Sequence, residues 1–271
     1  MIILGNGWTM IPTTNTIICG DCVKVMNNWE SDCIDLTVTS PPYDDIRDYN
    51  KYSFNFKAIA NELFRVTKDG GVVVWVVNDQ YVKGGRSGTS FKQALYFMDI
   101  GFLLHDDMIY LKSGFAHPSS NRYHQVWEHM FIFSKGKPKT FNPIKDRPNK
   151  WAGYTNWGKN TSRQKDGSLK EAPKQKPLKE YGMRFNVWEY SIGKGFSTKS
   201  KIAYEHPAIF PEKLARDHII SWSNEEDIVL DPMCGSGTTC VEAMKLNRQF
   251  IGIDISLDYC KLSMKRLGEN I

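Results

Sequence analysis

The chain has 271 residues, 41% of them hydrophobic and 24% charged, which is an ordinary composition for a globular protein that can bury one substantial core. No apolar run approaches the roughly 20 residues that cross a bilayer, and the first residues lack the basic start and apolar stretch of a signal peptide. We therefore expect no membrane association and a cytoplasmic location, in which the six cysteines are free thiols.

The net charge of +5 is unevenly distributed along the chain. Residues 112–201 hold 19 of the 35 Lys and Arg residues but only 6 of the 30 Asp and Glu residues. A basic segment within an otherwise acidic chain favours a polyanionic partner. The alternative is a lysine-rich surface that is merely solvated.

The first half of the chain alternates between strand and helix patterns. Apolar runs rich in β-branched residues predict strands, and apolar residues at intervals of three and four predict helices. Strands are expected at 16–19, 34–39, 72–77, 102–111 and 125–134, and helices at 21–29, 56–66 and 90–98. A break is expected at Asp69-Gly70-Gly71, and the unbroken run 72–77 is typical of a sheet covered on both faces.

Residues 135–201 lose this periodicity and are rich in Gly, Pro, Asn, Lys and aromatic residues. The aromatic side chains could stack on nucleic-acid bases or fill a small core, and for any single one we expect the core. Beyond this segment the pattern returns, with helices expected at 211–222, 238–246 and 257–267 and strands at 228–230 and 250–253. The alternation predicts an α/β fold with a doubly wound, mostly parallel sheet, in which 1–134 and 202–271 form one domain and 135–201 is an inserted, irregular basic lobe.

Residues 39–43, Thr-Ser-Pro-Pro-Tyr, end the predicted strand 34–39. Neither proline can donate a backbone hydrogen bond and both have a restricted φ, so the turn has little freedom to move. It would hold the Ser40 hydroxyl, the Pro41 carbonyl and the Tyr43 ring in one place, which suits a clamp for a planar amine. A strand that simply stops at a proline turn is the alternative.

A Gly-x-Gly turn, Gly235-Ser236-Gly237, lies between the predicted strand 228–230 and the helix 238–246. Such a turn lets the backbone approach a ligand at the carboxyl end of a parallel strand. No Gly-Lys-Ser/Thr follows, which disfavours an ATP-type phosphate loop, whereas Asp254 ends the next strand, where a carboxylate typically binds ribose hydroxyls. The combination favours a nucleoside cofactor that need not carry phosphates.

Cys19 and Cys22 have the CxxC spacing of some metal and redox sites. No second such pair and no nearby pair of histidines completes a tetrahedral ligand set. We therefore expect no metal in this protein.

The Ser-Pro-Pro-Tyr turn followed later by Asp-Pro-Met-Cys-Gly-Ser-Gly-Thr-Thr resembles the amino-group DNA methyltransferases. The order of the two motifs, with the basic segment between them, is similar to that of the β group, a circular permutation of the usual order. The resemblance extends to Gly20-Asp21, to 62–66 with Gly70-Gly71, and to 206–214, and so covers most of the chain outside the insert. It implies a Rossmann-like methyltransferase fold and S-adenosyl-L-methionine as the cofactor. The family usually has Phe where Met233 stands, a change that keeps volume and apolarity.

The resemblance also implies roles for individual residues. Ser40 and the Pro41 carbonyl would accept the hydrogens of the target amine, Pro42 would hold the turn, and Tyr43 would stack on a base flipped out of the duplex. Asp21 would lie near the adenine of the cofactor and Asp254 at its ribose. The methionine end would be lined or closed by a larger set: Phe210, Pro211, Asp231, Pro232, Cys234, Gly235, Ser236, Gly237 and Thr238.

The target would be the exocyclic N4 of cytosine, because Ser before Pro-Pro-Tyr is the tendency of such enzymes in the family; N6 of adenine, where Asp is usual, is the alternative. Methylation at carbon 5 needs a thiolate that typically follows a proline, and this chain has no Pro-Cys pair. RNA and protein-glutamine methyltransferases usually place the cofactor loop before an Asn-Pro-Pro-Tyr turn, the reverse order. A catalytically inactive DNA-binding module and a nicotinamide dehydrogenase are weaker alternatives.

Double-stranded DNA is the expected partner, as in restriction–modification systems, and a cognate endonuclease acting separately is a second candidate. The basic segment would be the target-recognition region, with cations on phosphates and amide or guanidinium groups on base edges. Arg47 would contact the backbone near the flipped base, although an ion pair with Asp44 or Asp48 is as plausible. The other cations expected on DNA are Arg122, Lys145, Arg147, Lys150, Arg163 and Lys165. The recognition sequence and the oligomeric state stay open.

Overall fold

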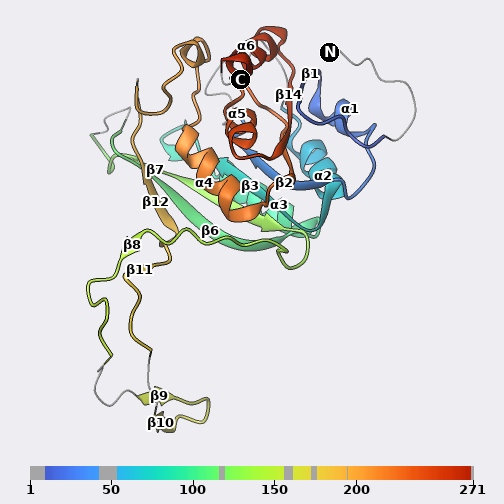
Figure 1. Ribbon diagram of the computed structural model, residues 1–271. Coiled ribbons are helices and arrows are strands. Elements are labelled where there is room, and N and C mark those ends of the chain that lie inside the picture. The colour runs from blue at the N-terminus through green and yellow to red at the C-terminus, as the bar shows by residue number, and fades with distance from the viewer. Residues whose placement is uncertain are drawn as a thin grey trace. The chain divides into compact units, whose positions relative to one another are not determined.

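The structure is a computed structural model that describes residues 10–42, 54–115, 120–155, 161–171, 176–193 and 195–269. Its main unit comprises residues 1–142 and 186–271, and a second compact unit comprises residues 143–185. The main unit contains one eight-stranded sheet with helices packed on it (Figure 1). The strands of this sheet are β1 (Thr16–Cys19), β2 (Ile34–Thr39), β3 (Thr67–Val77), β6 (Leu103–Lys112), β7 (Trp127–Ser134), β12 (Val187–Tyr190), β13 (Ile228–Asp231) and β14 (Gln249–Asp254).

The strand order in this sheet is β1-β14-β13-β2-β3-β7-β6-β12. Within the described strands every neighbouring pair is parallel except the two pairs that β7 forms with β3 and β6. Seven strands therefore run in one direction and their carboxyl ends share one edge. This confirms the predicted doubly wound, mostly parallel α/β fold, in which ligands bind at that edge.

Helices cover both faces of the sheet. The first group, α1 (Cys22–Met26), α2 (Phe56–Val66) and α3 (Thr89–Asp99), packs on one face, and α4 (Glu212–Trp222), α5 (Thr238–Lys245) and α6 (Leu257–Gly268) pack on the other. A short 3-10 turn, η1 (Ile202–Glu205), lies beside α6. The run Val72–Val77 of β3 is at most 1% exposed on both faces, as its unbroken apolar sequence predicts.

The core under the first helix group is built around Trp75 of β3. Its ring meets Phe97 of α3 at 5.1 Å between centroids in a T-shaped contact, and its indole nitrogen donates to Gln93 Oε1 at 2.9 Å. An edge-to-face pair with a satisfied indole N–H combines a large apolar burial with no polar penalty. The helices and β3 therefore close a single apolar layer.

Helix α2 begins and ends where its sequence pattern predicts. Asn55 caps it by accepting the Ala58 amide at 3.3 Å, and Ile59 and Leu63 bury one face. Arg65 then ties the helix to the end of α1, because its guanidinium donates to the carbonyls of Met26 at 2.6 Å and Trp29 at 2.8 Å. The helix is held by burial on one side and by this arginine on the other.

Two boundaries differ from the sequence prediction by three residues or more. Residues Asp69-Gly70-Gly71 do not separate helix from strand, because β3 begins at Thr67 directly after α2. Gly70 has φ of +78°, and the pairing register of β2 with β3 shifts at this level, so the glycines form an irregularity inside the strand. Helix α1 also ends at Met26, short of the predicted residue 29, and Trp29 packs as a buried side chain after it.

The second unit is shorter than the predicted insert 135–201. It contains two antiparallel pairs, β8 (Arg147–Pro148) with β11 (Tyr181–Gly182) and β9 (Thr161–Arg163) with β10 (Leu169–Glu171). Strand β12 lies within the predicted insert but pairs with β6 in the main sheet, and its Trp188 and Tyr190 are buried there.

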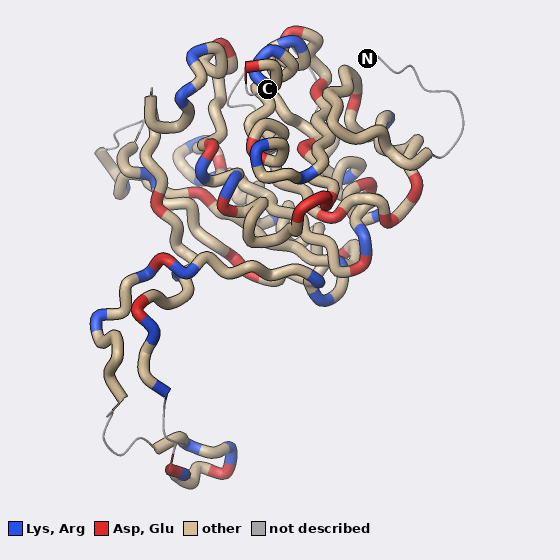
Figure 2. The backbone as a smooth tube through the Cα atoms, viewed as in Figure 1, with Lys and Arg blue, Asp and Glu red and all other residues tan. Residues whose placement is uncertain are grey.

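None of the described side chains of the second unit is buried. The prediction that its aromatic residues fill a core is wrong for Trp151, Tyr154, Tyr181 and Phe185, all of which are exposed. The reason is geometric, since two separate two-stranded ribbons offer no second layer to cover a side chain. Lys and Arg recur along the backbone of this unit, with Asp and Glu between them (Figure 2).

All six cysteines are free thiols, as expected, and Cys234, Cys240 and Cys260 are buried. Within the described ranges no helix is long and apolar enough to cross a membrane.

Gly252 of β14 offers a test of how closely the sheet packs against helix α5. A Cβ added there would lie 2.6 Å from Ile17 Cδ1 and 2.7 Å from Cys240 Sγ. We expect Gly252→Ala to lower the free energy of unfolding by about 1–3 kcal/mol through overpacking, measured by urea denaturation. The control is Gly268→Ala at the end of α6, where nothing lies within 4 Å, and its change should stay within about 0.5 kcal/mol. Equal effects of the two substitutions would contradict this packing argument.

Candidate functional site

The two sequence motifs lie side by side at the carboxyl edge of the sheet. Strands β2 and β13 are parallel neighbours, so the turn after Thr39 and the loop after Asp231 emerge together. The Thr39 hydroxyl donates to Asp231 Oδ1 at 2.8 Å, and the Thr239 hydroxyl donates to the Val38 carbonyl at 3.1 Å. Both bonds are buried and join segments about 200 residues apart in the chain. They fix the Ser-Pro-Pro turn against the Gly loop.

Ser40, Pro41 and Pro42 follow β2 directly; Pro41 is buried, and Ser40 and Pro42 are half-buried. The turn therefore places Ser40 at the same edge of the sheet as the Gly loop. Tyr43 and Arg47 lie outside the described residues.

Asp231 is the most strongly perturbed carboxyl of the site. Burial raises its pKa from 3.8 to about 6, while the Thr39 hydroxyl and the Met233 amide, which donate to it, and the nearby Thr239 hydroxyl oppose that rise. The negative charge of Asp254 raises the pKa of Asp231 further. A carboxylate kept in a dry pocket with few compensating charges is suited to bind a cation.

The Gly loop is shaped by two residues with positive φ, Gly235 at +51° and Gly237 at +75°. A Cβ at Gly235 would lie 2.8 Å from His206 Nε2, and one at Gly237 would lie 2.8 Å from Ser263 Oγ. The Ser263 hydroxyl also donates to the Gly235 carbonyl at 2.7 Å. Both glycines are thus required by backbone conformation and by the side chains packed on the loop.

Asp254, at the end of β14, lies next to this loop. Its two carboxylate oxygens accept the amides of Gly235 at 2.9 Å and Ser256 at 2.8 Å, and burial raises its pKa. Each carboxylate oxygen keeps a further lone pair, so the group can still accept bonds from a ligand hydroxyl. The Gly20 amide donates to the Asp254 carbonyl at 2.9 Å, which brings the end of β1 to the same place. Asp21 follows and caps α1 by accepting the Lys24 amide at 3.0 Å.

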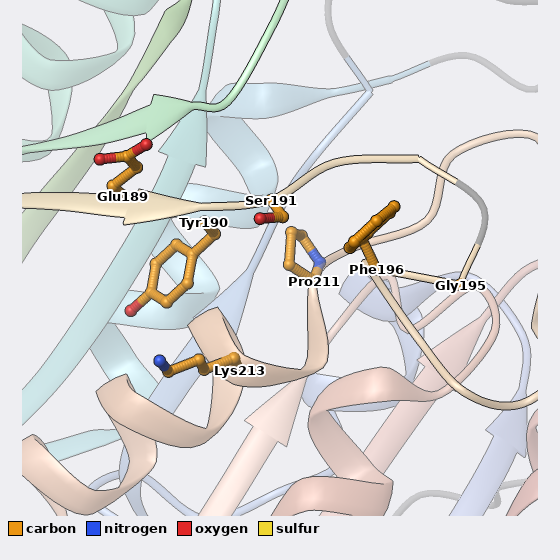
Figure 3. A pocket seen from close by; sticks show the side chains of 7 residues that line it. All are labelled: Glu189, Tyr190, Ser191, Gly195, Phe196, Pro211 and Lys213. Carbon is orange, nitrogen blue, oxygen red and sulfur yellow. The ribbon is translucent and has the colours of Figure 1, made fainter.

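Pro211 lines a cavity of ≈ 280 Å³ at the start of α4, together with the segment that follows β12 (Figure 3). In Figure 3 Pro211 lies between Ser191 and the Phe196 ring. Phe210 precedes Pro211 and is half-buried. The remaining lining residues, none of them predicted, are Glu189, Tyr190, Gly195 and Lys213.

The other predicted loop residues, Pro232, Cys234, Ser236 and Thr238, are all buried within the loop and the first turn of α5. A hydrogen bond with the neighbouring Cys240, together with burial, holds the pKa of the Cys234 thiol well above its usual range. The thiol beside the loop is therefore neutral and packs as an apolar group.

The cations predicted to contact DNA fall into two places. Lys145, Lys150, Arg163 and Lys165 are exposed in the second unit, and Arg147 there stacks on Phe185 with its guanidinium 4.5 Å from the ring centroid. Arg122 lies in the main unit, against the hairpin β4 (Tyr81–Val82)–β5 (Gly85–Arg86). Its guanidinium is 4.3 Å from the Tyr81 ring centroid and donates to the Gly84 carbonyl at 2.8 Å.

Besides the cavity-lining residues named above, four residues that hold the two motifs in place were given no role by the sequence prediction: Thr39, Thr239, His206 and Ser263. The two threonines fit strand and helix patterns without any cue that they bridge the motifs. His206 lies on Gly235, with its ring 4.4 Å from that of Tyr259 between centroids. The one available signal was that Gly-x-Gly turns need neighbours that fill the space left by the missing side chains.

The arrangement fits a nucleoside carrying a cationic side arm. Asp254 can accept ribose hydroxyls, the glycines leave room for close approach, and buried Asp231 attracts positive charge. Among the described residues, no three His, Cys, Asp or Glu side chains group together to hold a metal ion.

Comparison with known proteins agrees with this geometry. The family described as DNA methylase matches residues 34–265, which include both motifs. The orphan methyltransferase M.BamHII of Bacillus amyloliquefaciens is 59% identical over 241 residues, covering 89% of this chain and 91% of that protein. The type II methyltransferase M.SmaI of Serratia marcescens is 26% identical over 292 residues, covering 93% of this chain and 90% of that protein.

Solved structures show the same fold. The PvuII DNA methyltransferase (cytosine-N4-specific) has a TM-score of 0.69 at 21% identity, covering 96% of this chain and 87% of that one. The complex of M1.HpyAVI with S-adenosylmethionine has a TM-score of 0.60 at 22% identity, covering 93% of this chain and 99% of that one.

Asp231 yields a prediction about stability and pH. Because the pKa of its carboxyl rises from 3.8 to about 6 on folding, the folded chain holds this proton more tightly, and stability from this group falls as pH rises between these values. Asp231→Asn keeps an acceptor for Thr39 and removes the buried charge. We expect the free energy of unfolding of the variant to exceed that of the wild type by about 2–3 kcal/mol at pH 7. This gap between the two proteins should close as the pH falls from about 6 to about 4. Urea unfolding of both proteins across this range checks it, and a gap that widens towards low pH would contradict it.

Proposed function

Because the chain belongs to the DNA methylase family, we propose that it transfers a methyl group to the exocyclic N4 of cytosine in double-stranded DNA. It is an S-adenosylmethionine-dependent type II DNA methyltransferase of the group that modifies cytosine N4 or adenine N6, of the restriction–modification type. The proposal adds the target base, the roles of the individual residues and the way in which the base reaches them.

The observation that carries the proposal is the order of functional groups along the sheet edge. Strands β1, β14, β13 and β2 are consecutive neighbours, and their carboxyl ends bear Asp21, Asp254, Asp231 with the Gly loop, and Ser40 in that order. Neighbouring strands are about 4.8 Å apart, so the four ends span about 15 Å. This order supports a cofactor lying along the edge, with adenine and ribose at β1 and β14, methionine at β13 and the reactive end at β2.

S-adenosylmethionine supplies an electrophilic sulfonium methyl group when it is bound. In our proposal Asp254 holds the ribose and Asp231 attracts the positive charge of the methionine portion. Pro211 and Phe210 close that end, in line with the cavity that Pro211 lines. Asp231 can bind a cation only as a carboxylate, which its pKa of about 6 permits at neutral pH.

An exocyclic amine on a nucleobase is a poor nucleophile because its lone pair is delocalised into the ring. Ser40 Oγ and the Pro41 carbonyl accept the two amine hydrogens and draw them out of the ring plane, which localises the lone pair on nitrogen. The nitrogen would bond to the methyl carbon as the carbon–sulfur bond of the cofactor breaks, and one amine proton would then be lost to water. The rigid Pro-Pro turn supplies both acceptors without reorganisation, and positioning accounts for much of the rate enhancement. Tyr43 stacks on the base after it leaves the duplex.

The choice of cytosine rests on Ser40. A neutral hydroxyl stands where adenine enzymes of the family usually carry Asp. Direct transfer to nitrogen is further supported by the thiols, because burial keeps the pKa of Cys234 and Cys260 well above the usual range and leaves no thiolate at these positions for attack on carbon 6 of the ring.

The second unit is proposed to recognise the target sequence. Its exposed aromatic side chains lie among exposed cations, and Lys150 and Trp151 are neighbours within it, with the ammonium 5.9 Å from the ring centroid. Aromatic rings stack on bases and cations bind phosphates, whereas a ribbon without a core gains little by exposing such rings to water alone. Arg122 would add a phosphate contact from the main unit.

The target base is tested by identifying the methylated nucleoside. Unmethylated plasmid DNA is incubated with the protein and S-adenosylmethionine, digested to nucleosides and examined by mass spectrometry. We expect N4-methyldeoxycytidine. N6-methyldeoxyadenosine in its place would overturn the base assignment, and methylation of RNA alone would overturn the function.

Ser40→Ala tests the amine clamp. We expect turnover to fall about 10²–10³-fold, as when one preorganised polar partner of a transition state is removed, while the dissociation constant for S-adenosylmethionine stays within about twofold. Single-turnover kinetics and calorimetric titration give the two values. Ser31→Ala is the control, since Ser31 is exposed near the opposite end of β2. Near-normal turnover of Ser40→Ala would refute the clamp.

A further inference from the structure

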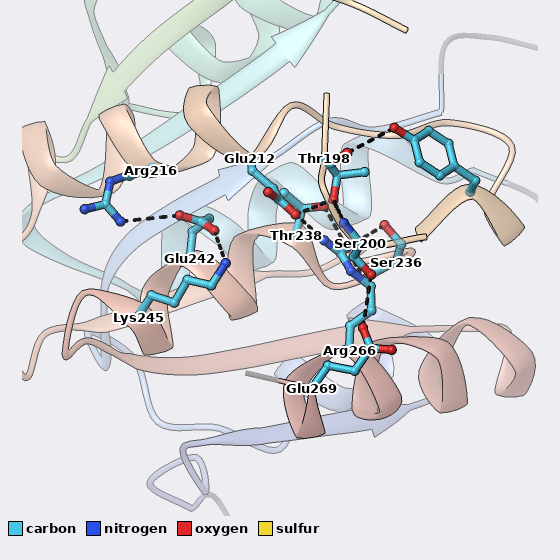
Figure 4. A network of polar contacts seen from close by, with 11 residues as sticks. Thr198, Ser200, Glu212, Arg216, Ser236, Thr238, Glu242, Lys245, Arg266 and Glu269 are labelled. Carbon is cyan, nitrogen blue, oxygen red and sulfur yellow. Dashed lines mark hydrogen bonds and ion pairs between the residues drawn. The ribbon is translucent and has the colours of Figure 1, made fainter. Parts of the chain in front are cut away.

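Arg266 of α6 is a buried cation that contacts two parts of the cofactor site (Figure 4). Its Nη1 donates to the Ser236 carbonyl at 2.6 Å, to Ser236 Oγ at 3.0 Å and to Thr238 Oγ1 at 3.0 Å. Its Nη2 donates to Glu212 Oε1 at 2.9 Å. One guanidinium group therefore joins the Gly loop to the first residue of α4.

Glu212 extends this connection to the cavity wall. Its carboxylate also accepts the Thr198 hydroxyl, and its backbone amide donates to the Ser197 carbonyl at 3.0 Å. Ser197 follows Phe196, and Glu212 follows Pro211, and both of these neighbours line the cavity. The position of that wall thus depends on the carboxylate that Arg266 holds.

The energetic cost of this arrangement argues for more than stability. Burial lowers the pKa of Arg266 and the Glu212 carboxylate opposes that fall, so a guanidinium that stays charged is held here at a cost in desolvation free energy. Replacing a buried ion pair by apolar side chains is often neutral or stabilising, so such a pair is weak grounds for a purely stabilising role. What a planar guanidinium adds is several donors in a fixed geometry, which sets the distance between its partners.

We propose that Arg266 is a positioning residue that sets the spacing between the two walls of the methionine end of the cofactor site. One wall is the Gly loop at Ser236 and Thr238, and the other begins at Pro211. The inference rests on the proposed roles of these residues in binding the methionine portion. Asp254 and Asp21 act at the adenosine end through bonds in which Arg266 takes no part.

A selective loss of affinity follows from this placement. Without Arg266 the two walls can drift apart. A misplacement of about 1 Å can cost an enzyme about 10²-fold in rate, and we expect the affinity for a ligand that contacts both walls to be similarly sensitive. A ligand that reaches both walls should lose affinity, whereas one confined to the adenosine end should not. S-adenosylmethionine is the first kind of ligand, and 5′-deoxy-5′-methylthioadenosine, which lacks the amino-acid portion, is the second.

The test compares the two dissociation constants by calorimetry at a temperature where every variant is folded by circular dichroism. We expect Arg266→Met to weaken S-adenosylmethionine about 10–100-fold and methylthioadenosine less than about threefold. Arg266→Lys, which keeps the charge but not the planar fork, should give an intermediate ratio. The matched control is Arg65→Met in α2, because Arg65 also donates to backbone carbonyls and pairs with a glutamate. This variant should lower the melting temperature but leave both dissociation constants unchanged.

Equal weakening of the two ligands by Arg266→Met, or no weakening of either, would overturn the inference. Should Arg266→Met fail to fold, Glu212→Gln replaces it, because the amide keeps an oxygen acceptor for Arg266 and Thr198 but accepts weaker hydrogen bonds than the carboxylate. The same selective loss of affinity for S-adenosylmethionine is then expected. Its absence would overturn the proposal. The ratio of the two dissociation constants does not depend on which base is methylated. A wild-type protein that binds no S-adenosylmethionine would instead overturn the proposed function.

Discussion

The hydrogen bond from Thr39 to Asp231 is the contact on which the rest of the site depends. It joins the last residues of β2 and β13, two strands whose motifs lie about 190 residues apart. A hydroxyl donating to a buried carboxylate is a charge-assisted bond in a low-dielectric setting, and therefore strong. Without the pairing of these strands, the Ser-Pro-Pro turn and the Gly loop would be two unrelated turns.

The site concentrates groups that a stable fold would otherwise avoid. Two carboxyls with raised pKa values, Asp231 and Asp254, lie at one edge, and two loop glycines adopt positive φ. Each costs folding free energy, through desolvation or through backbone entropy. The surrounding apolar layers on both faces of the sheet offset this cost. The unfavourable groups are gathered where a ligand with complementary charge and shape would relieve them.

Local patterns predicted many elements well. Strand β2 and helix α2 have the bounds that their periodicity indicates, because each buries one regular face or run. Prediction was less successful where local and tertiary demands differ. Gly70 and Gly71 are typical of a helix end but form an irregularity within β3, since β3 pairs with β2 on both sides of them. The prediction of a small core is wrong for the exposed aromatic residues of the second unit, because apolar character alone does not reveal whether a second layer of structure is present to bury them.

The sequence is sufficient to predict the alternating elements, the two motifs and their order, because spacing and turn chemistry are local properties. It also shows the chemistry available at each motif: a serine before two prolines, and a glycine loop flanked by acids. The tertiary structure was needed to place β13 between β14 and β2, which lines these groups along one edge. It alone placed Arg266 between the loop and Glu212, since a buried cation is recognised by the partners that enclose it, and those partners come from distant parts of the chain.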